Sequence, residues 1–508
     1  MILSKNTLAQ LQKAGSPGIP ADALFSLPEK VLQFGTGVLL RGLPDYFIDR
    51  ANRQSLFNGR IVIVKSTSQG AADEFGRQDN LYTQCVRGIE NGQRVDETII
   101  NSAVSRVLAA ADQWKEVLAC AANPALQLIV SNTTEVGITL VDNDNVYAEP
   151  PLSFPGKLLA FLLQRFKHFK GSADSGLVII PTELITENGS KLKQIVLELA
   201  RQNKLDTAFI EWIGAANDFC NSLVDRIVPG KLPGDDKAAT ESRLGYRDDL
   251  MIMSEVYRLW AIETSRERTK QVLSFAQADS GVVIAGNIEK FRELKLRLLN
   301  GSHTFTCAIA VQMGFATVKQ AMEDDAFCRF ITQLMMEEIV PAIAGTAVSA
   351  AEGRQFAGQV LDRYKNPFIE HQWLSISLQY SSKMKMRNVP VLQQYYEKTA
   401  GTPQCMALGF AAYLLFMKSA KNSDGSFTGN AGGKSYLIND DKAAALYELW
   451  DTGNTDNFVQ KVLENTQLWG TDLSALPGFR EAVTGAIHTI QQNGMAAAVQ
   501  KVHASQTT

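Results

Sequence analysis

Short runs of apolar residues recur along the first half of the chain, separated by stretches with helical spacing. Four runs rich in β-branched residues predict strands at 30–35, 59–67, 125–133 and 175–183. Each run is apolar almost throughout, as in a parallel sheet that is buried on both faces. Strands that alternate with helical stretches predict a doubly wound α/β domain.

The second half of the chain has a different pattern. From about residue 287 the apolar residues recur at helical spacing, in segments such as HTFTCAIAVQMGF and CMALGFAAYLLFMKSA. We expect the Gly-rich stretch 423–436 to be a loop between helices. The change of pattern predicts an α/β domain of Rossmann type over residues 1–285 and a mainly α-helical domain over residues 286–508.

Length and composition exclude several classes of protein. The 508 residues exceed what one hydrophobic core usually supports, which agrees with two or more domains. A net charge of −3 without a basic stripe argues against a nucleic-acid partner. No apolar run reaches the roughly 18 residues of a membrane span, and the N-terminus lacks the apolar core of a signal peptide. We therefore expect a cytoplasmic protein that binds neither nucleic acid nor membranes, and its oligomeric state stays open.

Cysteine and histidine spacing gives no sign of a metal site. The six cysteines form no CxxC pair and lie mostly in apolar runs, which is typical of buried, reduced thiols. No two of the five histidines have the spacing of metal ligands. We expect no bound metal.

A possible dinucleotide-binding turn follows the first predicted strand. Gly35 and Gly37 form a GxG before a helical stretch, where a side chain would keep a pyrophosphate away from the helix N-terminus. Leu40 replaces the third glycine of the GxGxxG motif, so a tight turn without a ligand remains the alternative.

The end of the second predicted strand bears on the choice of cofactor. It reads Lys65-Ser66-Thr67 and lacks the acidic residue that usually binds the ribose hydroxyls of NAD. This feature alone would favour NADP. Asp73 or Asp79 could supply the acid from further along the chain.

The segment KLRLLNGSHT, residues 295–304, carries three polar side chains in apolar surroundings. On a continuous α-helix, at about 100° per residue, Lys295, Asn300 and His303 share one broad face. Reduction of a ketone needs a proton donor, a group that stabilises the developing alkoxide, and a group that orients them. A lysine whose pKa is lowered by burial and nearby positive charge can donate the proton. From spacing alone, a surface helix with a solvated lysine remains the alternative.

Several motifs in order resemble the mannitol dehydrogenase family of polyol-specific long-chain dehydrogenases. KLRLLNGSH resembles the K-x4-N-x2-H catalytic segment, and FCNSLVDRIVPG (219–230) the V-D-R-I-x-P signature. GTGVLLR (35–41) is similar to the nucleotide turn of that family, and QDNLYT (78–83) and SNTTEVG (131–137) match further segments. These matches extend over about residues 30–390.

The resemblance implies a zinc-independent, NAD-linked enzyme with its site in a cleft between a Rossmann-type domain and a helical domain. It implies that Lys295 is the general acid/base, with Asn300 and His303 at the reacting oxygen. It places the cofactor on Phe34, Gly35, Thr36, Gly37, Arg41, Thr134 and Glu135. It places the substrate on Asp225, His371 and Lys383, although a structural bond to Arg226 is an alternative role for Asp225.

Within this family the chain most resembles a branch that reduces keto-sugar acids, and two departures from the polyol pattern support that resemblance. The segment Pro-Cys-Asp-Asn of polyol members reads Pro181-Thr182-Glu183-Leu184, so an oxyanion-binding Asn is missing and the role of Glu183 is open. The pattern N-P-x3-D-x3-R carries His371 and Ser375 in place of its Asp and Arg.

We expect a small sugar-acid substrate that is reduced with NADH. Lys383 is the first candidate to bind its carboxylate, and His371 could assist as a donor. A fructuronate-type or mannitol-type member of the family and, more remotely, a non-catalytic nucleotide-binding regulator are the alternatives.

Overall fold

The computed structural model describes residues 1–13, 18–65, 72–133, 137–450 and 454–504. The chain forms two compact units. The first comprises Met1–Gly88 and Arg94–Ile288, and the second comprises Ile89–Gln93 and Glu289–Thr508. A single division near residue 285 does not anticipate that the short segment 89–93 belongs with the second unit.

The first unit is built on a six-stranded sheet of order β5-β2-β1-β6-β7-β8, in which every neighbouring pair is parallel. Its strands are β1 (Glu29–Phe34), β2 (Arg60–Lys65), β5 (Val104–Ala109), β6 (Leu128–Ser131), β7 (Val178–Pro181) and β8 (Asp218–Phe219). The four strands predicted from the sequence are β1, β2, β6 and β7. The strand order reverses between β1 and β6, and open α/β sheets bind ligands at the carboxyl ends of the strands beside such a reversal.

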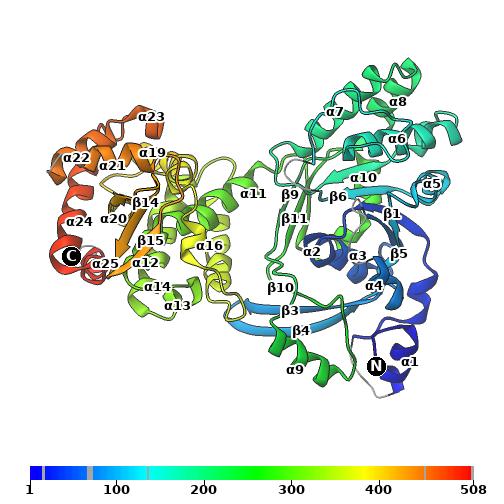
Figure 1. Ribbon diagram of the computed structural model, residues 1–508, viewed down its shortest axis with the longest axis horizontal. Coiled ribbons are helices and arrows are strands. Elements are labelled where there is room, and N and C mark those ends of the chain that lie inside the picture. Colours follow the sequence, from blue (N-terminus) through cyan, green and yellow to red (C-terminus); the bar gives the residue numbers. More distant parts are fainter. Residues whose placement is uncertain (14–17, 66–71, 134–136, 451–453, 505–508) are drawn as a thin grey trace. The chain divides into compact units, whose positions relative to one another are not determined.

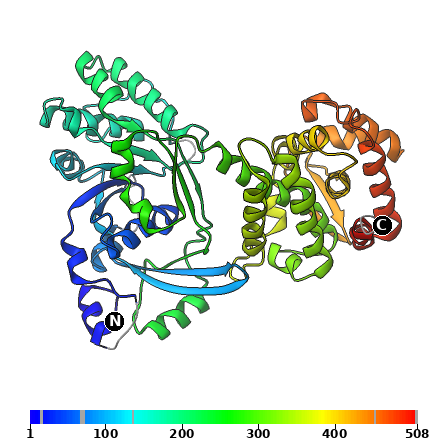
Figure 2. The same cartoon turned by 180° about the vertical axis from the view of Figure 1, so that it is seen from behind.

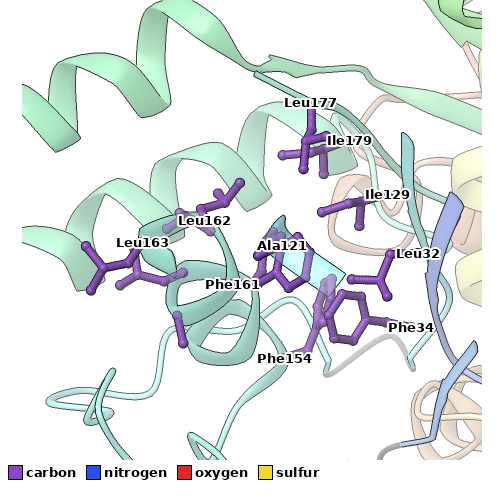
Figure 3. Packing of buried hydrophobic residues seen from close by; sticks show 14 of the residues in the cluster. Leu32, Phe34, Ala121, Ile129, Phe154, Phe161, Leu162, Leu163, Leu177 and Ile179 are labelled. Carbon is purple, nitrogen blue, oxygen red and sulfur yellow. The ribbon is translucent and has the colours of Figure 1, made fainter. Parts of the chain in front are cut away.

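Helices cover both faces of this sheet (Figure 1). One face packs against α5 (Trp114–Ala119), α6 (Phe154–His168), α7 (Asn188–Gln202) and α8 (Thr207–Ala216). Figure 3 shows Phe154 and Phe161 of α6 beside Leu32 and Phe34 of β1, and the rings of Phe34 and Phe154 lie 5.2 Å apart. The other face packs against α2 (Val38–Gly42) and α3 (Pro44–Arg53). Successive strand residues therefore point into two different cores, as in a doubly wound α/β fold.

Two smaller sheets complete the first unit. The hairpin of β3 (Tyr82–Glu90) and β4 (Gln93–Asn101) is extended by β10 (Ile252–Ser254), and β11 (Leu259–Glu263) lies between β9 (Ser222–Asp225) and β12 (Val282–Ala285). The remaining helices are α1 (Lys5–Lys13), α4 (Ala72–Arg77), α9 (Gly234–Leu244) and α10 (Glu267–Val272), with short 3-10 turns η1 (Asp22–Ser26), η2 (Cys120–Ala122), η3 (Ala173–Ser175) and η4 (Ser274–Ala278).

The second unit is mainly helical, and α12 (Ser302–Gln312) packs closely against α20 (Gln404–Phe416). A Cβ atom at Gly409 would lie 2.9 Å from the backbone oxygen of Phe305, so this glycine permits the close approach. The other helices are α11 (Glu289–Leu294), α13 (Val318–Met322), α14 (Asp325–Gln333), α15 (Val340–Ile343), α16 (Ala350–Tyr364), α17 (Trp373–Ile376), α18 (Tyr380–Lys383), α19 (Val389–Lys398), α21 (Ala443–Trp450), α22 (Thr455–Leu463), α23 (Thr466–Trp469), α24 (Phe479–Asn493) and α25 (Met495–Ala504).

Within the described part of the second unit, three segments are π-helical, namely η5 (Lys295–Gly301), η6 (Leu334–Ile339) and η7 (Met384–Asn388). The expectation of a continuous α-helix over residues 295–304 is therefore wrong for the first seven of them. A π-helix closes its hydrogen bonds over five residues and turns less per residue. Pro341 and Pro390 follow η6 and η7 within two residues, and each lacks the N–H that a regular α-helix would use there.

The expectation of a loop over 423–436 is also wrong. The segment contributes to a small antiparallel sheet of β13 (Ser419–Lys421), β14 (Phe427–Ala431) and β15 (Lys434–Leu437), seen among the orange elements in Figure 2. Gly432 and Gly433, with φ of +59° and +80°, form the two-residue turn between β14 and β15. Hairpin turns of this kind require positive φ at both positions, which is why glycines are found there.

Candidate functional site

The turn between β1 and α2 has the form that a dinucleotide site requires. Gly35 has φ of +125°, and a Cβ atom there would lie 2.8 Å from the backbone oxygen of Asn132. Gly37 is the N-cap of α2, and a Cβ atom there would meet nothing within 4 Å. Gly35 is therefore required by the packing of the chain itself, whereas the space at Gly37 is open to a ligand.

Other residues expected at the cofactor differ in their exposure. Phe34 is fully buried against Phe154, so only its backbone could meet a cofactor, while Thr36 is half-buried. Arg41 is packed inside the unit, where Nη1 donates to the backbone oxygen of Leu250 at 2.7 Å. Its guanidinium lies over the ring of Tyr82. Thr134 and Glu135 lie outside the described residues.

Glu183 organises the carboxyl end of β6. Its carboxylate accepts hydrogen bonds from the backbone N of Thr133 at 2.9 Å, from Thr133 Oγ1 at 3.0 Å and from Ser131 Oγ at 3.1 Å. Burial raises the pKa of Glu183, and these hydrogen bonds oppose that rise. Its role, which the sequence left open, is to fix residues 131–133, directly before the expected cofactor residues 134 and 135.

A buried carboxylic acid lies behind the nucleotide turn. Gln33 Nε2 donates to the backbone oxygen of Gly35 at 3.3 Å and to Asp45 Oδ2 at 3.5 Å. The hydroxyl of Tyr82 donates to the same carboxyl oxygen at 3.4 Å. Burial raises the pKa of Asp45 to about 7. No local sequence pattern indicated this network, because its members come from separate elements.

Asp225 is a buried residue at the end of β9, paired in the sheet with Leu259. The guanidinium of Arg226 donates to the backbone oxygens of Glu255 at 2.9 Å and Gly42 at 2.7 Å. The guanidinium of Arg226 therefore bonds to these backbone oxygens and not to Asp225. A structural bond to Arg226 was the alternative role for Asp225. Asp225 belongs to the first unit, whereas the other expected substrate residues belong to the second.

Lys295 and Asn300 lie on η5 and are half-buried, and His303 lies in the first turn of α12 and is 7% exposed. Thr304 Oγ1 donates to the backbone oxygen of Asn300 at 2.7 Å. A Cβ atom at position 301 would lie 3.3 Å from Asn388 Oδ1, so Gly301 leaves room for η7 to pack on η5. Gly301 therefore has a role in packing, whereas its polar neighbours Asn300 and His303 are the residues expected to act on the substrate.

His303 is enclosed by aromatic rings. It stacks on Tyr364 with 4.1 Å between ring centroids, and the rings of His371 and Trp373 meet it edge-on at 5.3 and 5.8 Å. Its Nε2 atom is buried and has no hydrogen-bond partner among the residues that the structure describes. Burial, followed by the charges of His371, Arg363 and Arg387, lowers the pKa of His303 well below its usual range. The result is a neutral imidazole with a ring nitrogen available to a bound ligand.

Basic side chains surround this histidine. Lys383 Nζ donates to the backbone oxygen of Ile376 at 2.8 Å, and burial followed by the charge of Arg387 lowers the pKa of Lys383. Burial and the charge of Lys383 lower the pKa of His371. His371 therefore contacts His303, and Lys383 is close enough to His371 for its charge to act on that ring. The structure brings both expected substrate residues near His303.

The sequence interpretation missed the role of Tyr364. Its hydroxyl donates to the backbone oxygen of Leu299 at 2.8 Å and is hydrogen-bonded to Ser302 Oγ at 2.8 Å. These bonds fix the ring on which His303 stacks. Tyr364 ends α16, far from η5 in the sequence, so no local pattern could reveal the contact.

Two absences apply to the described part of the chain. No group of three or more His, Cys, Asp or Glu residues within it could hold a metal ion. Across the same residues, no helix is both long and apolar enough to cross a membrane.

Two family models match most of the chain. The Mannitol dehydrogenase Rossmann domain matches residues 29–274, and the Mannitol dehydrogenase C-terminal domain matches residues 287–491. Among curated proteins, altronate oxidoreductase of Bacillus subtilis (strain 168) is 37% identical over 484 residues, covering 94% of this chain and 96% of the relative. Altronate oxidoreductase of Yersinia enterocolitica is 36% identical over 482 residues, covering 93% and 97%.

Solved structures of low sequence identity share the fold. Mannitol 2-dehydrogenase of Pseudomonas fluorescens, in a ternary complex with NAD and D-mannitol, has a TM-score of 0.65 at 22% identity and covers 99% of both chains. A substrate-free D-sorbitol dehydrogenase has a TM-score of 0.77 at 20% identity, covering 98% of this chain and 100% of the other. These matches confirm the Rossmann-type and mainly helical fold classes, and with the family models and curated relatives they establish that the chain belongs to the mannitol dehydrogenase family.

Proposed function

We propose that the chain is an NAD-linked altronate oxidoreductase, which reduces the ketone of D-tagaturonate to the secondary alcohol of D-altronate in hexuronate breakdown. The observation that carries this proposal is the likeness to curated altronate oxidoreductases, at 37% identity over nearly the whole of both chains. That likeness does not favour the fructuronate-type or mannitol-type alternative. Retention of Lys295, Asn300 and His303 argues against a regulator without catalysis.

The nucleotide turn fits a dinucleotide, since the space at Gly37 is open and Gly35 is held by the chain itself. Residues 1–285 would hold NAD, through the backbone of residues 34–37 and through Thr134 and Glu135. NADH supplies the hydride when it is bound. Glu183 supports this role by fixing Thr133, whose neighbour Asn132 packs against Gly35 of the nucleotide turn.

The second unit supplies the groups that act on the sugar acid. Lys295 would give its proton to the oxygen of the reduced ketone, and in the reverse direction would take the proton from the alcohol. The side-chain amide of Asn300 would donate to the same oxygen as negative charge develops on it. His303 is neutral, so its unpaired Nε2 can hold a substrate hydroxyl without competing for the proton.

Turnover of NADH, followed by its absorbance with a panel of keto-uronates and ketohexoses, tests the assignment. We expect the highest kcat/KM with D-tagaturonate and little activity with uncharged ketohexoses. A preference for D-fructuronate or for a ketohexose would reassign the chain within its family. The absence of turnover with every member of the panel would overturn the proposal. A cytoplasmic location is part of it, and cell fractionation checks that point.

A further inference from the structure

A cationic group that the catalytic scheme does not use lies beside the site of the second unit. Arg387 is half-buried on η7, and its Nη1 donates to Thr304 Oγ1 at 3.2 Å. Thr304 follows His303 directly and is itself bonded to the backbone of Asn300. The guanidinium is therefore attached to α12, which carries His303 and directly follows the π-helix of Lys295 and Asn300.

Arg387 itself has no acidic counterpart in the described part of the chain. Within the described residues it forms no ion pair with a carboxylate, and the titratable group that acts on its pKa besides burial is Tyr364, whose own pKa is raised by burial so that its hydroxyl is uncharged near pH 7. Arg363 and Arg387 both act on His303, and Lys383 acts on His371. A half-buried guanidinium without an acidic partner is suited to an anionic ligand.

Lys383 is a weaker candidate for the same task. Its ammonium already donates to the backbone oxygen of Ile376 at 2.8 Å, and the carboxylate of Asp440 acts on its charge. A lysine offers a point charge, whereas a guanidinium offers a planar fork that matches the two oxygens of a carboxylate. Arg387 therefore has both the less compensated charge and the better geometry.

We propose that Arg387 binds the carboxylate of the substrate and makes the site specific for sugar acids over uncharged sugars. The assignment rests on the proposed function, since it concerns the acid end of the keto-uronate. It leaves Lys383 to the substrate hydroxyls. A second, independent observation is that Nε2 of His303 is buried and has no hydrogen-bond partner among the described residues. A substrate hydroxyl bound to this nitrogen would lie beside α12, the helix to which Arg387 is bonded.

The test compares kcat/KM for the keto-uronate with kcat/KM for the ketohexose that has a hydroxymethyl group in place of the carboxylate. Arg387→Met should lower this ratio about 30- to 100-fold, as expected when one partner of a partly buried, hydrogen-bonded charge pair is removed. Lys385→Met is the matched control, because Lys385 is an exposed cation on the same π-helix. It should leave the ratio unchanged.

Other outcomes separate the two proposals. A wild type that does not reduce the keto-uronate would refute the proposed function, whatever the variants do. A wild type that reduces it, with an unchanged ratio in Arg387→Met, would refute the carboxylate assignment alone. A selective loss in Lys383→Met and not in Arg387→Met would likewise give the carboxylate to Lys383. If Arg387→Met does not fold, Arg387→Gln decides, because glutamine removes the charge and keeps a hydrogen-bond donor: a lowered ratio would support the assignment, and a ratio equal to that of the wild type would refute it.

Discussion

Arg297 connects the π-helices η5 and η7 of the candidate site by hydrogen bonds. From these bonds we estimate how much stability the protein loses when Arg297 is replaced. From η5, its Nη1 donates to the backbone oxygens of Met386 at 2.8 Å and Arg387 at 3.0 Å on η7. Pro390 cannot supply the helical N–H that would reach the oxygen of Met386 four residues earlier. The guanidinium replaces that missing donor, so Arg297→Met should destabilise the packing of η7 on η5.

The size of the effect follows from the bonds that are lost. Hydrogen bonds from a charged donor contribute about 1.5 kcal/mol each, and the ion pair of Arg297 with Glu293 contributes about 0.5 kcal/mol because Glu293 is 26% exposed. The expected loss is about 3.5 kcal/mol of unfolding free energy. For a unit of this size it corresponds to a decrease of roughly 7–14 °C in Tm.

Thermal unfolding followed by calorimetry measures this decrease. Arg292→Met is the control, because Arg292 lies in the preceding helix α11, pairs with Glu289 and forms no hydrogen bond to η7 among the described residues. Its Tm should change by less than about 2 °C. In a Pro390→Ala background the restored N–H can reach Met386, so Arg297→Met should cost about 1 kcal/mol less. Equal changes in Tm for Arg297→Met and Arg292→Met would refute the reasoning.

Three further predictions concern chemistry, cofactor and pH. Lys295→Ala should lower kcat about 10²- to 10⁴-fold while NADH still binds in a fluorescence titration, and near-normal turnover would show that Lys295 is structural. The kcat/KM with NADH should exceed that with NADPH, and the reverse order would direct attention to Lys65. Glu338 accepts from the backbone N of Cys405 and Met406, and burial raises its pKa from 4.5 to about 7. Its contribution to stability is therefore complete below about pH 4.5 and is lost as the pH rises through 7, so the wild type should lose about 2–3 kcal/mol relative to Glu338→Gln between pH 5 and 8 in urea unfolding. A difference that does not change with pH would contradict this.

The sequence predicted the sheet of the first unit well, because a doubly buried strand leaves a run of apolar residues that few other elements share. The sequence predicted local structure less well where the same residues are compatible with two kinds of element. Glycines at 432 and 433 were interpreted as part of a loop, although a pair of glycines between alternating residues also predicts a hairpin. Over seven residues, the spacing of apolar positions does not distinguish a π-helix from an α-helix.

The residues of the candidate site could also be predicted only in part, because some of them are distant from one another in the sequence. Lys295, Asn300 and His303 lie within nine positions, so one local motif was enough to group them. His371 and Arg387 lie far from His303 in the sequence. His371 reaches it by a ring contact, and the proximity of Arg387 depends on how η7 packs on α12. The stacking of Tyr364 on His303 arises between residues that are distant in sequence, and no spacing rule could supply it.

The division of the chain between its two units affects how relatives could be recombined. The chain passes from one unit to the other at 88–89, 93–94 and 288–289, and Gly92 in the short returning segment donates to Asp362 Oδ2 at 3.3 Å. A chimaera made with one crossover near residue 288 would combine segment 89–93 of one parent with the helical unit of the other. Specificity could therefore be transferred between family members only if these five residues were exchanged together with the C-terminal half.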